Sequence, residues 1–140
     1  MRQTTQVRVR YADTDAAGIV HYAKYLAYLE AARAEALRAV GLDRESVAAF
    51  LLKAPIQEAR LQYRSPARFD ELLDVTTWVT NVSDAQCRWR YEVLRHADGD
   101  VVLTAETDHR WSDSPRALEG SSIQLEISRT LAQLEDARPL

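Results

Sequence analysis

Apolar and polar residues alternate with a period of two in one stretch near the start of the chain and in four more after Pro55. This alternation is typical of strands with one buried face. The stretches cover residues 7–11, 59–63, 73–79, 87–93 and 101–111. Asp98-Gly99 between the last two is a hairpin signal, so we expect the later strands to follow one another as antiparallel neighbours.

A helical period separates the first strand from the others. Apolar residues recur at i, i+3, i+4 and i+7 from Tyr22 to Val40, and Gly41 follows as a stop signal. Charged residues mostly fill the other face of this helix, namely Lys24, Glu30, Arg33, Glu35 and Arg38. Asp43 is placed to cap a short second helix through Leu52. A closing helix is indicated by Ile123, Ile127, Leu131 and Leu134.

These elements predict a single α+β domain over residues 1–140, in which an antiparallel five-stranded sheet wraps around one long central helix. A sheet must cover its apolar face, and the long helix is the element available to do so. The other face of the sheet and its edge strands remain uncovered. We therefore expect the chain to form homo-oligomers.

Composition narrows the class of protein. Hydrophobic residues make up 46% and charged residues 28% of the chain, which favours a globular protein over a disordered one. The net charge of −3 argues against an overall basic surface for nucleic acid, and no apolar run approaches the roughly 18–20 residues that span a bilayer. The single cysteine, Cys87, excludes an internal disulfide and fits a reducing compartment. With no signal peptide ahead of the first strand, we expect a cytoplasmic protein.

The candidate chemistry lies just before the long helix. Asp13 and Asp15 occupy a predicted loop at the helix N-terminus, where backbone N–H groups have no intrahelical partner and the helix dipole is positive. A carbonyl oxygen bound there would be polarised, with a carboxylate near its carbon, as acyl transfer requires. Aspartates before helices are more often caps or turn formers, so the spacing alone favours that simpler interpretation.

At these residues the chain resembles a known family, the hotdog-fold acyl-CoA thioesterases of the 4-hydroxybenzoyl-CoA thioesterase type, especially the bacterial branch associated with the Tol–Pal system. The family pattern reads aromatic-x-Asp-x-Asp-x-x-Gly-aliphatic-Val-x-x-x-x-Tyr. Its positions in this chain are Tyr11, Asp13, Asp15, Gly18, Ile19, Val20 and Tyr25. Residues 63–70 also look like the family's turn after the second strand. The resemblance implies a hotdog fold and hydrolysis of acyl-CoA to free acid and CoA, without a metal or other cofactor.

The resemblance also implies roles for individual residues. Asp15 is the catalytic carboxylate, as nucleophile or as general base toward water, and the backbone N–H of Tyr22 holds the thioester carbonyl. Asp13 is structural, and Gly18 permits an unusual backbone geometry or a close approach of substrate. The expected substrate-binding residues of this segment are Gly18, Ile19, Val20 and His21. A surface position at the start of the helix is the simpler interpretation of His21.

In this fold the site lies between two subunits, so a homodimer is the minimum and a homotetramer is expected. The partner subunit would contribute Arg60, Tyr63 and Ser65. The family often has a basic residue in the turn between the third and fourth strands, near the CoA phosphates, but residues 83–86 contain no Lys or Arg. Arg88 and Arg90 either hold the phosphates instead or are solvated strand charges. An acyl-carrier-protein thioester therefore stays open as a substrate beside acyl-CoA.

Two alternative functions remain. A hotdog hydratase or dehydratase would pair Asp15 with His21, although the hydratase signature Asp-x-Asn-Pro-aliphatic-His is absent. A non-catalytic acyl-thioester binding module would use Asp15 only as a cap. The three histidines lack metal-binding spacing, and His109, on the apolar face of the last strand, is expected to be buried with its hydrogen bonds satisfied.

Overall fold

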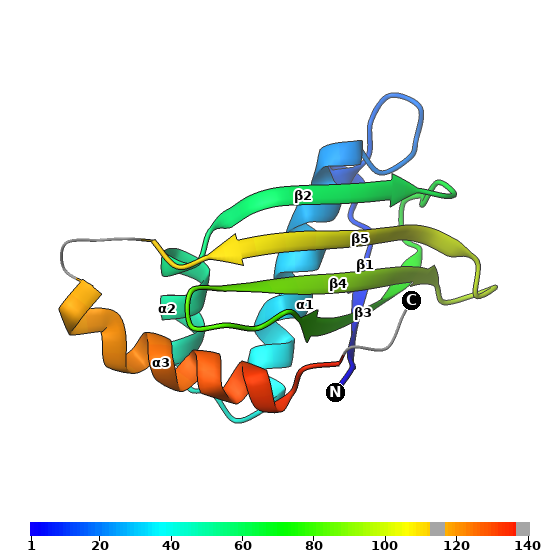
Figure 1. Cartoon of the computed structure of the whole chain (residues 1–140). Helices are drawn as coiled ribbons and strands as arrows, with labels where there is room; N and C mark the ends of the chain where they lie inside the picture. The colour runs from blue at the N-terminus through cyan, green and yellow to red at the C-terminus, as the bar shows by residue number, and fades with distance from the viewer. Residues whose placement is uncertain (113–116, 137–140) are drawn as a thin grey trace.

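One antiparallel sheet forms the body of the molecule (Figure 1). A computed structural model of the chain describes residues 1–112 and 117–136, with the side chains of 117–123 left aside. The sheet has five strands in the order β1-β3-β4-β5-β2. They are β1 (Gln3–Arg8), β2 (Ile56–Tyr63), β3 (Leu72–Thr80), β4 (Gln86–Arg95) and β5 (Val101–Arg110). The expected α+β class and five-stranded antiparallel sheet are confirmed.

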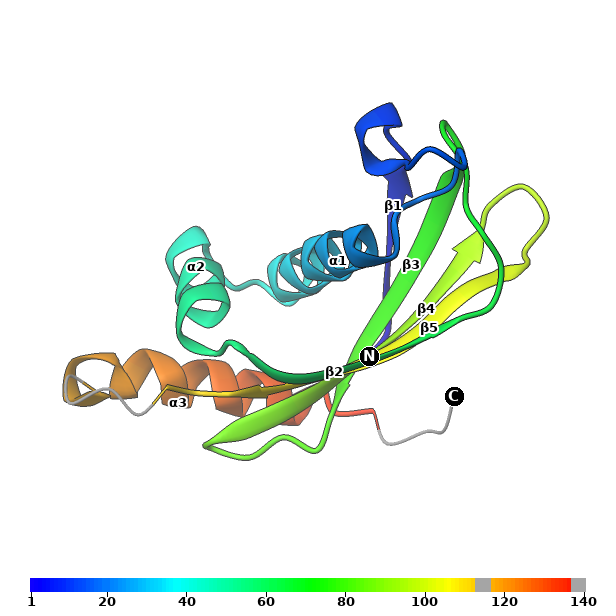
Figure 2. The same cartoon turned by 90° about the horizontal axis from the view of Figure 1, so that it is seen from above.

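The sheet curves around the central helix α1 (Tyr25–Ala39), as the view from above shows (Figure 2). A 3-10 turn, η2 (Tyr22–Lys24), leads directly into α1, so the predicted helix begins with a tighter turn. Gly41 ends it in the left-handed region, with φ of +90°. Two further helices follow, α2 (Arg44–Lys53) and α3 (Ala117–Gln133).

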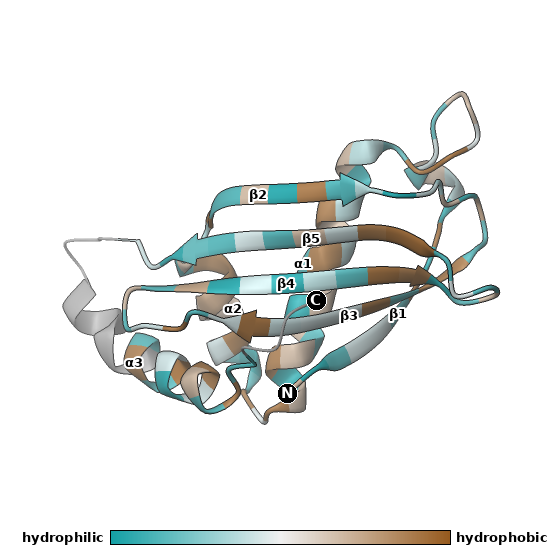
Figure 3. Cartoon of the chain, turned by 45° about the vertical axis from the view of Figure 1, so that its right-hand side comes forward, coloured by the Kyte–Doolittle hydropathy of each residue, from teal (hydrophilic) through white to brown (hydrophobic). Residues whose placement is uncertain are grey.

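The hydrophobic core lies between α1 and the inner face of the sheet. Strands β3 and β4 bury every second residue there. Figure 3 shows hydrophobic stretches on β4 and β5 next to the hairpin that joins them. The fully buried core side chains of these layers include Leu29, Leu37, Leu73, Val75, Tyr91 and Val93. Of the predicted closing-helix residues, Ile127 and Leu131 are also buried, whereas the side chain of Ile123 lies outside the described residues. Asp43 accepts a hydrogen bond from the Ser46 N–H at 2.9 Å and caps α2, as expected.

The position of β2 differs from the expected succession of hairpins. Strands β3, β4 and β5 do follow one another as neighbours, but β2 pairs with β5 at the opposite edge from β1. Leu61 is half-buried, and the other seven residues of β2 are exposed. So little burial within one chain is typical of an edge strand, one side of which has no partner in the chain.

Two further details correct the sequence analysis. The first strand ends at Arg8, and Tyr11 is 77% exposed in the short turn η1 (Tyr11–Asp13). Arg33, expected on the polar face of the long helix, is only 4% exposed. Its position is explained by a hydrogen-bond partner that periodicity does not reveal.

That partner starts a chain of buried hydrogen bonds between α1 and the sheet. Arg33 Nη1 donates to Tyr91 Oη at 2.9 Å, and Tyr91 Oη lies 2.7 Å from Thr107 Oγ1. Thr107 Oγ1 lies 2.8 Å from His109 Nε2, and His109 Nδ1 lies 2.9 Å from the Ala54 carbonyl oxygen. A carbonyl only accepts, so Nδ1 carries the proton of a neutral imidazole and Nε2 accepts. The expectation of a buried, satisfied His109 is confirmed.

This arrangement predicts a loss of stability in mild acid. Burial, and then the charge of Arg33, lowers the pKa of His109 from 6.5 to about 4. Between these two values the unfolded chain binds a proton that the folded chain does not, so the free energy of unfolding falls as the pH falls from 6.5 to 4. The loss should be on the order of 3 kcal/mol.

Urea unfolding across that pH range would measure the loss. His109→Gln should flatten the dependence, because glutamine takes up no proton in this range. An unaltered slope in His109→Gln would contradict the assignment.

Candidate active site

Asp13 is a buried carboxylate that fastens the loop before α1. Its side chain is 1% exposed and accepts a hydrogen bond from Tyr28 Oη at 2.7 Å. Arg10 adds a bond from Nη2 at 3.0 Å, and the Asp13 carbonyl accepts from the His21 N–H at 2.9 Å. Burial alone would raise the pKa of Asp13, but the hydrogen bonds from Arg10 and Tyr28 prevail and lower it. The structural role predicted for Asp13 agrees with these contacts.

Asp15 lies two residues further along, in an exposed tight turn. Its Oδ1 accepts a hydrogen bond from the Ala17 N–H at 2.8 Å, and its carbonyl accepts from the Gly18 N–H at 3.0 Å. Gly18 has φ of +78°, and a Cβ built on it would meet nothing within 4 Å. The glycine is therefore needed for its backbone conformation, and the close approach of substrate expected at this open position stays a prediction. No cation of the described residues forms an ion pair with Asp15, so its carboxylate stays available to a substrate.

The loop returns to the body of the protein through Ile19 and Val20. The Val20 N–H donates to the Ala67 carbonyl at 2.9 Å, and Ile19 forms a bridge with Arg68. Val20 is buried in the core. Both residues thus hold the loop against the segment after β2. The side chain of Val20 faces the core, and the substrate contacts expected of Ile19 and Val20 stay predictions.

The start of the helix presents a free backbone donor, the N–H of Tyr22. His21 is the cap of η2, and its Nδ1 accepts from the Ala23 N–H at 3.2 Å. No hydrogen bond within the described part of the chain uses the N–H of Tyr22, the first residue of η2. Such N–H groups at a helix start suit an oxygen that carries negative charge.

Tyr63 joins this region from β2 of the same chain. Its hydroxyl donates to the Tyr22 carbonyl oxygen at 2.9 Å, and its ring packs against Tyr25 with centroids 5.7 Å apart. The sequence analysis placed Tyr63 at the site from a partner subunit. Within one chain it already supports the turn that carries the Tyr22 N–H. Ser65 does not reach this turn, because its hydroxyl donates to the Val101 carbonyl at 2.9 Å.

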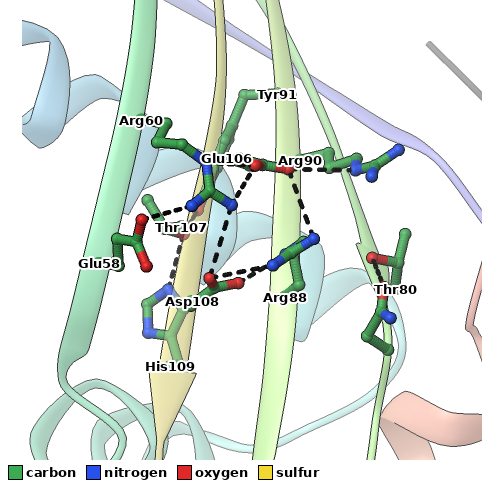
Figure 4. A network of polar contacts seen from close by, with 11 residues as sticks. Glu58, Arg60, Thr80, Arg88, Arg90, Tyr91, Glu106, Thr107, Asp108 and His109 are labelled. Carbon is green, nitrogen blue, oxygen red and sulfur yellow. Dashed lines mark hydrogen bonds and ion pairs between the residues drawn. The ribbon is translucent and has the colours of Figure 1, made fainter.

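The structure gathers Arg60, Arg88 and Arg90 on the outer face of the sheet, away from α1 (Figure 4). Each faces a carboxylate: Arg60 contacts Glu58 and Glu106, Arg88 Nε lies 2.6 Å from Asp108, and Arg90 Nε lies 3.5 Å from Glu106.

The hydrogen bond from Arg88 lowers the pKa of Asp108. Each of the three arginines is paired with a carboxylate, so none of them is a free cation. The phosphate contact expected of Arg88 and Arg90 and the partner-subunit contact expected of Arg60 stay predictions.

Sequence reasoning missed the side chains that act through Asp13. The bond from Tyr28 to a carboxylate 15 residues earlier has no local signal in the sequence. Arg10 falls within the predicted strand 7–11, and that alternation does not reveal its contact with Asp13. Cys87 is buried as expected, and burial raises its pKa to about 12, which keeps the thiol protonated.

With this geometry in place, comparison with known proteins identifies the family. A family model described as the thioesterase-like superfamily matches residues 9–131. The chain belongs to this superfamily.

Among relatives of this thioesterase, the acyl-CoA thioester hydrolase YbgC of Escherichia coli is 37% identical over 100 residues, which cover 71% of this chain and 74% of the relative. A solved hypothetical protein from Thermus thermophilus is 31% identical with a TM-score of 0.78, over 97% of this chain and 99% of that one. The 4-hydroxybenzoyl-CoA thioesterase of Pseudomonas sp. strain CBS-3 is 25% identical with a TM-score of 0.69, over 79% and 84% of the two chains. The hotdog fold and the thioesterase class that the sequence predicts are confirmed.

Among the described residues, no helix of this thioesterase is long and apolar enough to cross a membrane. Within the same residues, no cluster of three or more His, Cys, Asp or Glu side chains is arranged to hold a metal ion.

Removing the Tyr28 hydroxyl should loosen the loop. In Tyr28→Phe the buried Asp13 carboxylate loses its bond at 2.7 Å, and a hydrogen bond to a charged group contributes about 1.5–3 kcal/mol. We expect the free energy of unfolding, measured with urea, to fall by about that amount. Tyr11→Phe makes the same chemical change at a 77% exposed residue and should cost almost nothing. Equal effects of the two substitutions would show that the Asp13 contact does not fasten the loop.

Proposed function

We propose that this thioesterase hydrolyses acyl-CoA thioesters at the junction between the loop and α1. One observation carries the proposal: an exposed Asp15 carboxylate without an ion-pair partner precedes the unused N–H of Tyr22 in a rigidly fastened loop. The names of the relatives, which include an acyl-CoA thioester hydrolase, support the substrate class. Among the described residues, only Oδ1 of Asp15 is engaged, which leaves Oδ2 for chemistry.

The chemistry divides between two groups. The Tyr22 N–H donates a hydrogen bond to the thioester carbonyl oxygen and stabilises the negative charge that develops there. Asp15 then either takes a proton from the water that attacks the carbonyl carbon or attacks that carbon itself. In both routes the carbon–sulfur bond breaks and CoA leaves as the thiol after taking up a proton. In the first route water supplies the new oxygen of the free acid. In the second route the acyl group is left on Asp15 as a mixed anhydride, and water hydrolyses that anhydride to release the free acid and restore the Asp15 carboxylate.

The hydratase alternative gains no support from the geometry. It requires a histidine that moves protons beside the carbonyl. His21 instead uses Nδ1 to accept the Ala23 N–H and stacks its ring on Tyr22, with centroids 4.3 Å apart. The binding-module alternative makes a different prediction for Asp15, because a cap contributes stability and no turnover.

Asp15→Asn separates catalysis from capping. An asparagine Oδ1 can still accept the Ala17 N–H, so the free energy of unfolding should change by less than about 0.5 kcal/mol. The rate constant kcat should fall by about 10²–10⁴-fold, because the amide can neither attack nor take a proton. Thiol release from short, long and aromatic acyl-CoAs would measure it.

Asp98→Asn is a matched control, because Asp98 Oδ1 accepts the Asp100 N–H at 2.9 Å in a similar turn of the β4–β5 hairpin. It should keep full activity. Wild type that releases no thiol from any acyl-CoA would contradict the proposed function, and a folded, active Asp15→Asn would contradict the role of Asp15.

We also propose that the enzyme assembles at least as a homodimer through β2. One edge of this strand pairs with β5, and the other has no neighbour within the described chain. Its exposed residues include Ile56 at 37% and Tyr63 at 51%. An uncovered strand edge of this kind pairs readily with a second copy.

Sedimentation should therefore give a mass of at least twice the 15.9 kDa of one chain. A homotetramer, the state expected from the resemblance, would give four times that mass. A monomer at micromolar concentration would contradict the assembly through β2.

A further inference from the structure

A cavity of about 190 Å³ lies beside the middle of α1 and is lined by residues of α1, α2 and the start of β2. None of its lining residues belongs to the loop of Asp15 or to η2. The lining combines the apolar side chains of Phe50, Leu51 and Ile56 with the polar side chains of Glu30, Arg33 and His109. Its volume equals that of about six water molecules in the liquid, so it suits a small molecule.

Arg33 brings a positive charge to this cavity without a counter-ion. The residue is 4% exposed, and its Nε is buried with no hydrogen-bond partner. No carboxylate of the described residues lies within ion-pair distance of its guanidinium. Nη1 is used by Tyr91, which fixes the orientation of the group.

The hydrogen-bond chain behind Arg33 cannot compensate its charge. Because His109 Nδ1 donates to the Ala54 carbonyl, Thr107 donates to Nε2, Tyr91 donates to Thr107, and Arg33 donates to Tyr91. Figure 4 shows Tyr91, Thr107 and His109 side by side along β4 and β5. Every member beyond Arg33 is neutral, and each is already engaged.

A buried charge with only neutral neighbours is costly, and the cost is relieved when an anion binds. A carboxylate is the group that a guanidinium binds best, through short charge-assisted hydrogen bonds. We propose that this cavity binds the carboxylate group of a small organic acid, with the Nε–H of Arg33 as donor and Phe50, Leu51 and Ile56 around the carbon chain. The proposal goes beyond thioester hydrolysis and does not depend on it.

Glu30 is the group that opposes an acid here. It is exposed at the cavity and lies one helical turn before Arg33. Its charge repels an entering carboxylate. Replacing it with glutamine should therefore tighten the binding of an acid, whereas the same change at the exposed Glu35, which pairs with Arg38 outside the cavity, should not.

Butyrate and its neutral counterpart butyramide are the probes, titrated into the full-length protein by calorimetry or amide NMR. Butyrate should bind with a Kd on the order of 1 mM, as expected for about six heavy atoms with one ionic contact. Butyramide should not saturate at about tenfold higher concentration, since it has no charge to offer Arg33. Arg33→Met, which keeps an unbranched side chain, should weaken butyrate binding at least about tenfold.

If Arg33→Met does not fold, Glu30→Gln still tests the proposal, because this substitution leaves the buried hydrogen-bond network intact. It should bind butyrate several-fold tighter than wild type, and Glu35→Gln should match wild type. The proposal is overturned if butyramide binds as well as butyrate, if wild type does not bind butyrate, or if only Glu30→Gln binds it. The last result would show that Glu30 itself closes on Arg33.

Two sources could supply the carboxylate: a free acid, or the far end of a CoA-linked acyl group. Turnover of glutaryl-CoA and butyryl-CoA by Arg33→Met separates them. A loss confined to glutaryl-CoA assigns the carboxylate to the acyl group, and an equal effect on both assigns it to a free acid. Binding of butyrate is measured without turnover, so it stands or falls separately from the proposed hydrolysis.

Discussion

The buried carboxylate of Asp13 holds the loop and the helix in one arrangement. It binds Tyr28 from α1 and Arg10 from the chain after β1, while its own backbone carbonyl accepts the N–H of His21. These bonds connect both ends of the loop to the first turns of α1. An ionised group can stay buried there because its oxygens are engaged by hydrogen-bond donors, one of them a cation. The exposed Asp15 and the free N–H of Tyr22 take their positions from this anchor.

The two faces of the sheet use charge in different ways. On the outer face, arginines and carboxylates alternate across β2, β4 and β5 and compensate one another close to solvent. On the inner face a single guanidinium, Arg33, is buried against neutral partners. The paired charges of the outer face leave little net electrostatic field for a ligand. The charge of Arg33 has no such pair, so an anion can neutralise it. The sheet therefore separates a neutralised surface from an electrostatically unsatisfied interior.

Hydrophobic periodicity predicted the elements correctly wherever burial depends on the local sequence. The long helix, its end at Gly41, the cap at Asp43 and the inward faces of β3 to β5 all follow from spacing and residue type. Pairing between distant segments does not follow from spacing, so the sequence analysis did not place β2 beside β5. These two strands lie far apart in the chain, and no local pattern reveals that they pair.

In the candidate site, too, local motifs can be seen in the sequence, whereas contacts between distant residues cannot. Asp15 and Tyr22 were found through a motif and a resemblance, and the structure supports them with an exposed carboxylate and an unused N–H. The contacts that position them, from Tyr28 and Tyr63, join residues 15 and 41 positions apart. Arg33 looked like a surface charge because a helical wheel cannot show a buried hydroxyl on a strand opposite.

The most direct measurement of the central claim is the amide NMR signal of Tyr22 in Asp15→Asn during titration with a non-hydrolysable acyl-CoA analogue that has a ketone in place of the thioester. A carbonyl bound at the helix start predicts a large downfield shift of the Tyr22 amide proton, with slowed exchange, while amides of the β4–β5 hairpin stay unchanged. Binding of the analogue that leaves the Tyr22 amide unmoved would contradict the claim that this junction polarises the substrate.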